Sequence, residues 1–177
     1  MVNNYKTCNY YYSKGVKYAL ISKEITLEEI KEILRESKTT CMVETFSIPS
    51  VAFSKRKLLT NYYTDLHKTP KKELSIIEKA TNTEYKVEED DLGTNFYLNT
   101  LTNASSVIKD LYEANCPYII LREYGIAEDL FSNILVDTKK YIEGNCQDKE
   151  YIEKYKDLTT STNFFFKKTI YRVKKND

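Results

Sequence analysis

The 177-residue chain contains no tryptophan, only one histidine, four glycines and three prolines. The low glycine and proline content excludes collagen-like and linker-rich chains. No run of apolar residues approaches the roughly 18 that a membrane-spanning helix needs, and the first residues lack the apolar core of a signal peptide. These absences predict a folded cytoplasmic protein that does not use a membrane as a partner.

An excess of charge of one sign is also absent. The 27 Lys and Arg residues balance 26 Asp and Glu residues, which leaves a net charge of +1. Such a chain has no global field that gathers nucleic acid, so any RNA binding would have to rest on a local patch. With 41% hydrophobic residues the chain is long enough to bury one core, and we expect a single domain over residues 1–177.

The cysteines are few and lie far apart in the sequence. Cys8, Cys41, Cys116 and Cys146 include no Cys-x-x-Cys pair. Zinc and iron–sulfur sites depend on ligand pairs a few residues apart, so we expect isolated buried thiols, no metal site and no cofactor. The single histidine, His67, has no Ser or Cys nucleophile beside it in the sequence, which gives a hydrolytic triad little support.

Tyrosine is abundant, with 16 residues beside 7 phenylalanines. A tyrosine ring buries apolar area while its hydroxyl seeks water or a hydrogen-bond partner. We therefore expect a partly amphipathic core. We also expect a layer of partly buried, partly solvated tyrosines where further structure or a partner packs.

The order of sequence patterns predicts an α/β fold. An aromatic helix over 4–14 ends at Gly15, and a strand follows over 16–22. A second helix begins after Thr26, where Thr26-Leu27-Glu28-Glu29 is a capping box, and a second strand covers 41–46. This alternation of helix and strand is typical of a parallel sheet.

The alternation stops from about residue 49 to 95. Two apolar runs over 74–78 and 84–88 predict an antiparallel hairpin, an insertion over about 73–90. The acidic run 88–91 is interpreted as a solvated turn.

The alternation of helix and strand then resumes. It continues with a strand over 96–99, a helix over 105–115, a strand over 117–122, helices over 127–143 and 148–156, and a C-terminal strand over 169–173. The strand over 117–122 is a continuous apolar run of the kind buried on both faces in parallel sheets.

Four segments carry a resemblance when taken in order. Residues 12–30 read as Gly-Val-Lys, a strand and then an acidic Leu-Glu-Glu-Ile helix, and 43–46 form a Glu-bearing strand. The run Ser54-Lys55-Arg56-Lys57-Leu58-Leu59-Thr60-Asn61-Tyr62 fits a Ser-x-Arg-x-Leu-Leu-x-Asn-Tyr motif. Residues 88–99 are an acidic, Gly-Thr, Leu-Asn passage, and 119–123 are a strand followed by Arg. This order resembles the collagenase-like U-32 peptidases, and the ending over 165–174 resembles their short bacterial members.

The resemblance implies a (β/α)-barrel scaffold and a hydrolase that acts on a peptide or protein, with its catalytic type unassigned. Some relatives use iron–sulfur clusters to hydroxylate ubiquinone precursors or RNA bases. Their cysteines in and after the Arg motif are missing here, where position 57 is Lys. The family's N-terminal half is missing too, which leaves about four of the eight barrel strands.

We therefore expect a partial (β/α) TIM-barrel-like domain with parallel strands, an inserted β-hairpin and a C-terminal strand extension. An open half-barrel would expose the edges and faces of apolar strands such as 119–121. Self-association, or a partner that completes the barrel, would cover them.

Chemistry in barrels and open parallel sheets lies beyond the carboxyl ends of the strands. That rule selects Ser22, Lys23, residues 44–47, Asn99, Arg122 and Glu123. Arg122 could clamp a carboxylate or phosphate, and Glu44 or Glu123 could act as acid or base, so these three are the candidate catalytic residues. An ordinary salt bridge at a strand end is the alternative.

The basic run over 55–57 could bind phosphate, and nearby aromatic and amide side chains could contact bases. Arg56, Asn61 and Tyr62, which fall on the family motif, are the candidate substrate-binding residues together with Asn99. A solvated loop explains the basic run equally well. The function expected first is a peptidase, and the alternatives are a non-catalytic binding or assembly module and an RNA-modification-related protein of the same family.

Overall fold

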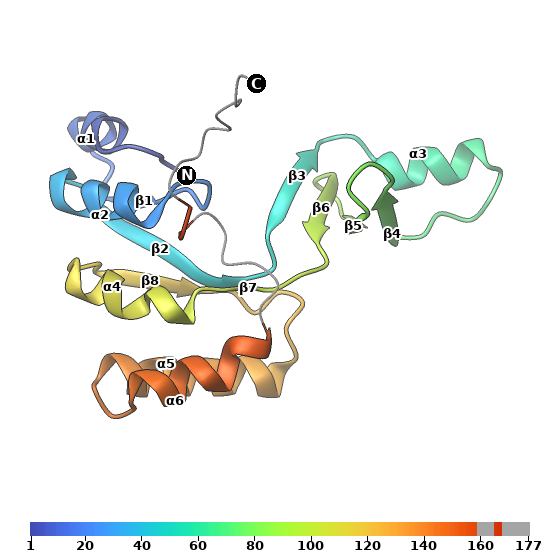
Figure 1. Ribbon diagram of the computed structural model, residues 1–177. Coiled ribbons are helices and arrows are strands. Elements are labelled where there is room, and N and C mark those ends of the chain that lie inside the picture. The colour runs from blue at the N-terminus through green and yellow to red at the C-terminus, as the bar shows by residue number, and fades with distance from the viewer. Residues whose placement is uncertain (159–164, 168–177) are drawn as a thin grey trace, which may run out of the picture. The chain divides into compact units, whose positions relative to one another are not determined.

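A computed structural model describes residues 1–158 and 165–167 (Figure 1). The chain divides into two compact units, a first unit of Met1–Ser47 with Thr102–Asp177 and a second unit of Ile48–Leu101. One sheet is mainly parallel and the other is antiparallel, so the expected α/β class is confirmed at that level. The expected C-terminal strand over 169–173 lies outside the described residues.

Strand β2 (Thr40–Ser47) is the centre of the sheet in the first unit. It pairs in parallel with β1 (Tyr18–Leu20) and with β8 (Tyr118–Leu121), and antiparallel with the short β7 (Thr102–Asn103). Met42 pairs with residues of both β1 and β8, so these two strands lie on opposite sides of β2. Among the described strands, β8 pairs with β2 alone and forms an edge of the sheet.

Helices α1 (Tyr5–Ser13) and α2 (Leu27–Glu36) begin where the sequence predicts. The Thr26 hydroxyl accepts a hydrogen bond from the Glu29 backbone N–H at 3.3 Å, and the Glu29 carboxylate accepts one from the Thr26 backbone N–H at 2.7 Å. This reciprocal pair confirms the capping box. One core cluster joins these helices to β1, β2, η1 (Ser105–Val107) and α4 (Ile108–Glu113), with Cys8, Ile21, Ile30, Val43, Val107 and Leu111 among its buried residues.

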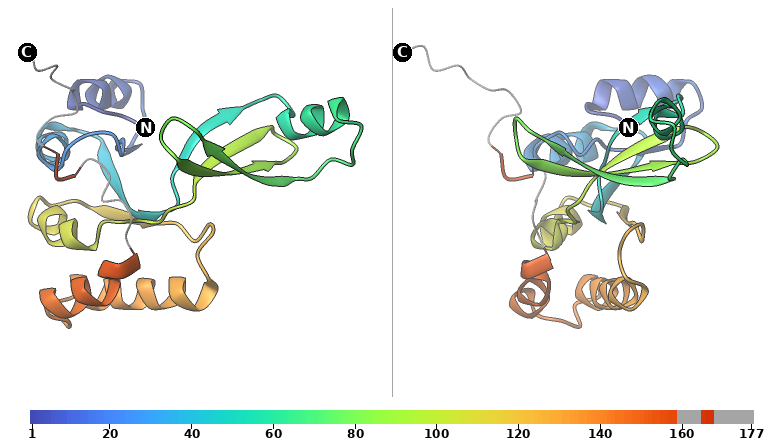
Figure 2. Two further views of the ribbon diagram at one scale, coloured as in Figure 1. Left: turned by 45° about the vertical axis from the view of Figure 1, so that its right-hand side comes forward. Right: turned by 90° about the vertical axis from the view of Figure 1, so that its right-hand side faces the viewer.

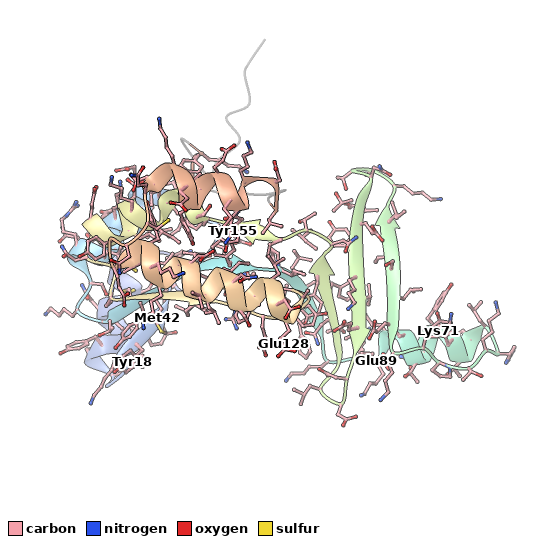
Figure 3. All side chains as sticks on the ribbon, turned by 90° about the horizontal axis from the view of Figure 1, so that it is seen from below. Tyr18, Met42, Lys71, Glu89, Glu128 and Tyr155 are labelled. Carbon is pink, nitrogen blue, oxygen red and sulfur yellow. The ribbon has the colours of Figure 1, made fainter. Side chains whose placement is uncertain are left out.

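A second core cluster lies under α5 (Glu128–Ile142), α6 (Asp148–Tyr155) and η2 (Lys156–Leu158). Figure 3, which labels Glu128 on α5 and Tyr155 on α6, shows the two helices side by side. The rings of Tyr141 and Tyr151 stack with centroids 4.5 Å apart, and the Tyr151 hydroxyl lies 2.5 Å from the Thr138 hydroxyl. The expected amphipathic tyrosine core is confirmed here.

The strand over 117–122, expected from its apolar run to be buried on both faces, is only partly covered, and it lies at an edge of the sheet, as also expected for residues 119–121. Tyr118 is 52% exposed, and the other residues of β8 are only half-buried. The rings of Tyr18 and Tyr118 meet edge to face on one side of the sheet, with centroids 6.4 Å apart. The apolar run of β8 carries no information about whether a neighbouring strand is present.

Among the described residues, no helix has both the length and the apolar character needed to cross a membrane.

The second unit is an antiparallel sheet in the order β3 (Ser50–Ser54), β6 (Thr94–Leu98), β5 (Thr83–Glu89) and β4 (Glu73–Glu78), with the helix α3 (Leu58–Asp65) (Figure 2). Strands β4 and β5 form the expected antiparallel hairpin. The expectation that the strand over 96–99 resumes the parallel alternation is wrong, because β6 pairs antiparallel with both β3 and β5. The connection from β5 to β6 is a short turn, which can only reverse the chain.

Candidate functional site

Four side chains meet at the carboxyl ends of the parallel strands in the first unit. Glu44, 3% exposed on β2, forms ion pairs with Lys23, which follows β1, and with Arg122, which follows β8. Arg122 Nε donates to Glu44 Oε2 at 2.5 Å, and Lys23 Nζ also donates to the Ser47 hydroxyl at 3.3 Å. We call Lys23, Glu44, Ser47 and Arg122 the Glu44 cluster.

The cations of the Glu44 cluster keep its carboxylate ionised. Burial acts to raise the pKa of Glu44, but hydrogen bonds from Arg122, Lys23 and Ser47 outweigh it and hold the pKa below its ordinary value. A carboxylate held in this way is a weak proton acceptor at neutral pH. It can orient the Arg122 guanidinium, whose side chain is 51% exposed and so is open to an anion from solvent.

The rule that chemistry lies beyond the carboxyl ends of parallel strands selected every member of this cluster from the sequence. Of the three candidate catalytic residues, Glu44 and Arg122 are in direct contact, and Glu123 is an exposed residue that follows Arg122 in the chain. Lys23 and Ser47, selected by the same rule, complete the cluster. Their contact does not make a serine nucleophile with a lysine base, because Ser47 is 1% exposed and Lys23 is ion-paired with Glu44.

The candidate substrate-binding residues Arg56, Asn61 and Tyr62 lie on and just before α3 in the second unit, and all three are exposed. The Tyr62 side chain is 52% exposed, and its ring meets that of the buried Tyr63 edge to face, with centroids 5.3 Å apart. Residues 55–72, which we call the basic segment, hold six Lys or Arg residues and one Asp. This is a strong local excess of positive charge in a chain that is nearly neutral.

The start of α3 is fixed by residues about 30 positions away. Lys57 precedes the helix and gives it no side-chain cap. Instead, Glu89 Oε2 accepts hydrogen bonds from the backbone N–H groups of Leu59 at 2.8 Å and Thr60 at 3.2 Å. The Thr94 hydroxyl accepts one from the Leu58 N–H at 3.0 Å. These bonds satisfy the backbone donors that a helix N-terminus leaves open.

Glu89 therefore has a structural role that the sequence analysis missed. Burial acts to raise the pKa of its carboxyl, but hydrogen bonds from Thr60, Leu59 and Thr94 outweigh it and hold the pKa below its ordinary value. The interpretation of 88–91 as a solvated turn is wrong for Glu88 and Glu89, which lie in β5, and fits the exposed Asp90 and Asp91. A cap formed between distant residues leaves no signal at local spacing.

Residues 1–169 match the family described as Peptidase family U32. The chain belongs to this family. It is also 22% identical, over 188 aligned residues, to tRNA hydroxylation protein P2 of Bacillus subtilis (strain 168). The match covers 95% of this chain and 61% of the relative, so the chain spans less than two thirds of that relative's length. No solved structure matches the chain.

Asn99 of this U32 protein belongs to the second unit. Its side-chain amide donates to Glu84 Oε2 at 2.8 Å within the second unit. Asn99 follows β6, an antiparallel strand, so the rule for parallel sheets that selected it does not apply.

The cysteines of this U32 protein do not fit the iron–sulfur cluster that some members of the family use. Cys8 and Cys41 are buried, Cys116 and Cys146 are half-buried, and all four are free thiols. Burial, with smaller contributions from the nearby Cys8 and Cys116 thiols, raises the pKa of the Cys41 thiol to about 11. Within residues 1–158 and 165–167, no three His, Cys, Asp or Glu side chains are arranged to hold a metal ion.

Proposed function

We propose that this U32 protein binds RNA and takes part in a tRNA-modification reaction. The observation that carries the proposal is the exposed basic segment, because a chain with a net charge of +1 can gather RNA only through such a local patch. The match to a relative named for tRNA hydroxylation, over 95% of this chain, supports the same reaction class.

The basic segment offers the two kinds of contact that single-stranded RNA needs. Lys55 and Arg56 are exposed cations for phosphate, and Tyr62 presents a half-exposed ring on which a base can stack. The exposed Asn61 amide can donate to and accept from a base edge. Glu89 fixes the start of α3 and so keeps these groups at a constant spacing.

The Glu44 cluster has the chemistry of an anion site in this proposal. Two cations share one buried carboxylate, which leaves a net positive charge and a half-exposed guanidinium at the strand ends. Glu44 and Lys23 act as positioning residues, and Arg122 is the group that meets the anionic ligand, a phosphate or a carboxylate. The exposed Glu123 beside Arg122 is the remaining candidate for proton transfer in the first unit.

Peptide hydrolysis, which the family description names, is the second candidate. The geometry supports it less, because the Glu44 carboxylate is held ionised by two cations and the Ser47 hydroxyl is buried. The Ser47 hydroxyl is therefore not accessible to attack a peptide carbonyl, and the Glu44 carboxylate is too weak a base to activate water.

We also propose that β1, β2 and β8 with their helices are part of a (β/α) barrel, and that the two units work as one domain. The parallel pairing of the three strands and the cluster at their carboxyl ends support the barrel. The unbroken family match over residues 1–169 supports the single domain.

The test is tRNA binding measured by filter binding between about 50 and 200 mM salt. We expect affinity to fall steeply with salt, and the double variant Lys55→Glu with Arg56→Glu to reduce the slope of log affinity against log salt by about 2. Lys79→Glu, an exposed reversal in the β4–β5 turn, is the matched control and should leave the slope unchanged. Absence of tRNA binding at low salt would overturn the proposal, and cleavage of unfolded protein substrates by the same sample would favour the peptidase.

A further inference from the structure

Exposed aromatic side chains cover part of α1 and the turn that follows it. Residues 10–18 are all exposed, without interruption, and they include four tyrosines. Tyr10, Tyr11 and Tyr12 on α1 are 60%, 46% and 47% exposed. Rings in this position give up the apolar burial that a core would provide, and a group of them is typical of an interaction surface.

Lysines lie on the same face of the helix as the most exposed of these rings. Lys6, Tyr10 and Lys14 are exposed at positions i, i+4 and i+8, which places them in one row about 6 Å apart along the axis of α1. The opposite face is covered, because Cys8 is fully buried in the core cluster that α1 shares with α2. Figure 1 shows α1 beside α2. We call Lys6, Tyr10, Tyr11 and Lys14 the Tyr10 surface.

The Tyr10 ring is held by its neighbours without being covered. The Lys14 ammonium lies 5.7 Å from the centroid of this ring. The Tyr11 ring meets it edge to face, with the two centroids 5.5 Å apart. These contacts restrict the ring before a ligand arrives, which lowers the entropy cost of binding. The ring remains open to a flat group that could stack on it, since more than half of the side chain is exposed.

The charge around the Tyr10 surface is positive. Residues 1–23 contain four lysines and no Asp or Glu. On the adjacent α2, the Glu36 carboxylate is already ion-paired with Arg35, with Arg35 Nε 2.8 Å from Glu36 Oε1, and the exposed Lys38 follows. Exposed rings interleaved with cations complement a ligand that combines flat bases with phosphates.

We propose that the Tyr10 surface binds unpaired nucleotides of RNA, with a base stacked on the Tyr10 ring and phosphates beside Lys6 and Lys14. This site belongs to the first unit, whereas the basic segment belongs to the second, and its assignment rests on the RNA binding proposed above. An anionic membrane fits the surface less well. A helix that lies in a membrane interface turns an apolar face to the lipid, and the apolar face of α1 is buried in the core.

The absence of tryptophan allows a direct test on the 177-residue chain. Tyr10→Trp keeps a stacking ring at this site and adds the chain's only tryptophan. A base that stacks on this ring should quench its fluorescence when tRNA is added, with an affinity close to that of wild type. Tyr112→Trp is the matched control. Tyr112 is 65% exposed on α4 but lies near Asp110 and Glu113, so tRNA should leave the fluorescence of this variant unchanged.

Filter binding of tRNA measures what the ring and the two lysines contribute to affinity. Tyr10→Ala should weaken binding about tenfold, because the stacked base is lost. Tyr10→Phe keeps the ring, and Tyr112→Ala removes a ring elsewhere, so both should bind as wild type does. Lys6→Gln combined with Lys14→Gln should reduce the slope of log affinity against log salt by about 2.

The outcomes separate this inference from the proposed function. If the wild-type protein binds tRNA, but Tyr10→Ala binds equally well and the Tyr10→Trp fluorescence does not change, the Tyr10 surface alone is overturned. If the wild-type protein does not bind tRNA at low salt, both proposals are overturned. A blue shift of the Tyr10→Trp fluorescence with phosphatidylserine vesicles, without quenching by tRNA, would assign the surface to a membrane and overturn this inference.

Discussion

The Glu89 carboxylate accepts a hydrogen bond from the Leu59 backbone N–H at 2.8 Å, across 30 positions of sequence. The contact joins the acidic passage at the end of β5 to the first turn of α3, where the basic segment begins. A carboxylate at a helix N-terminus also interacts favourably with the helix dipole. The acidic and basic motifs that resemble the family are therefore parts of one local structure.

Replacement of Glu89 should destabilise α3 and weaken RNA binding indirectly. Glu89→Gln removes the charge and part of the capping, which we expect to cost about 1 kcal/mol of the free energy of unfolding. Urea denaturation followed by circular dichroism measures this change. Asp91→Asn removes an exposed carboxylate in the adjacent turn and should have no effect. An equal loss in both variants would show that the Glu89 cap is unimportant.

Gly93 should tolerate no larger residue. Its φ is +151°, and an added Cβ would lie 2.1 Å from the Ser54 backbone oxygen, closer than any real contact allows. We expect Gly93→Ala to lower the free energy of unfolding by about 2–3 kcal/mol. Gly15→Ala is the control, because Gly15 also has a positive φ, +88°, but its added Cβ would meet no atom within 4 Å. Thermal unfolding of both variants should show a clearly larger shift for Gly93→Ala.

The parts of this structure that depend on neighbours in sequence could be predicted. The capping box at Thr26 fixes the start of α2 within one turn, and Glu44 and Arg122 follow from the rule that parallel strands end at one edge. The Glu89 cap could not be predicted, because nothing at local spacing relates Glu89 to Leu59. The apolar pattern of β8 alone could not predict its edge position, since the pattern of a strand does not show whether another strand lies beside it.

The Glu44 cluster should make the first unit sensitive to acid. The pKa of Glu44 is lower in the folded protein than its ordinary value of 4.5, so its contribution is present above that value and is lost as the pH falls through the folded pKa. Glu44→Gln should cost about 2 kcal/mol of the free energy of unfolding at pH 7, and the difference from wild type should shrink below pH 4.5.

The control for this prediction is Glu28→Gln, which removes a carboxylate that is 84% exposed and pairs with Lys31. Its difference from wild type should be small at every pH. Urea denaturation at a series of pH values measures both. A Glu44→Gln effect that stays constant through the acid range would contradict the lowered pKa.

The stacked tyrosines of α5 and α6 should make the first unit sensitive to alkali. Burial raises the pKa of Tyr151 to about 12, partly opposed by its hydrogen bond with Thr138, and burial with the nearby Asp148 raises that of Tyr141 to about 12. A raised pKa gives stability that is complete below the ordinary value of 10 and is lost as the pH rises towards 12.

Tyr151→Phe should cost about 1 kcal/mol of the free energy of unfolding at pH 7, because the Thr138 hydroxyl loses its hydrogen-bond partner. The same variant should lose less stability than wild type between pH 10 and 12. Tyr112→Phe, at a site 65% exposed, should change neither quantity. Unfolding measured by circular dichroism, with ionisation followed by absorbance at alkaline pH, separates the two variants, and identical alkaline profiles would contradict a role for the Tyr151 hydroxyl.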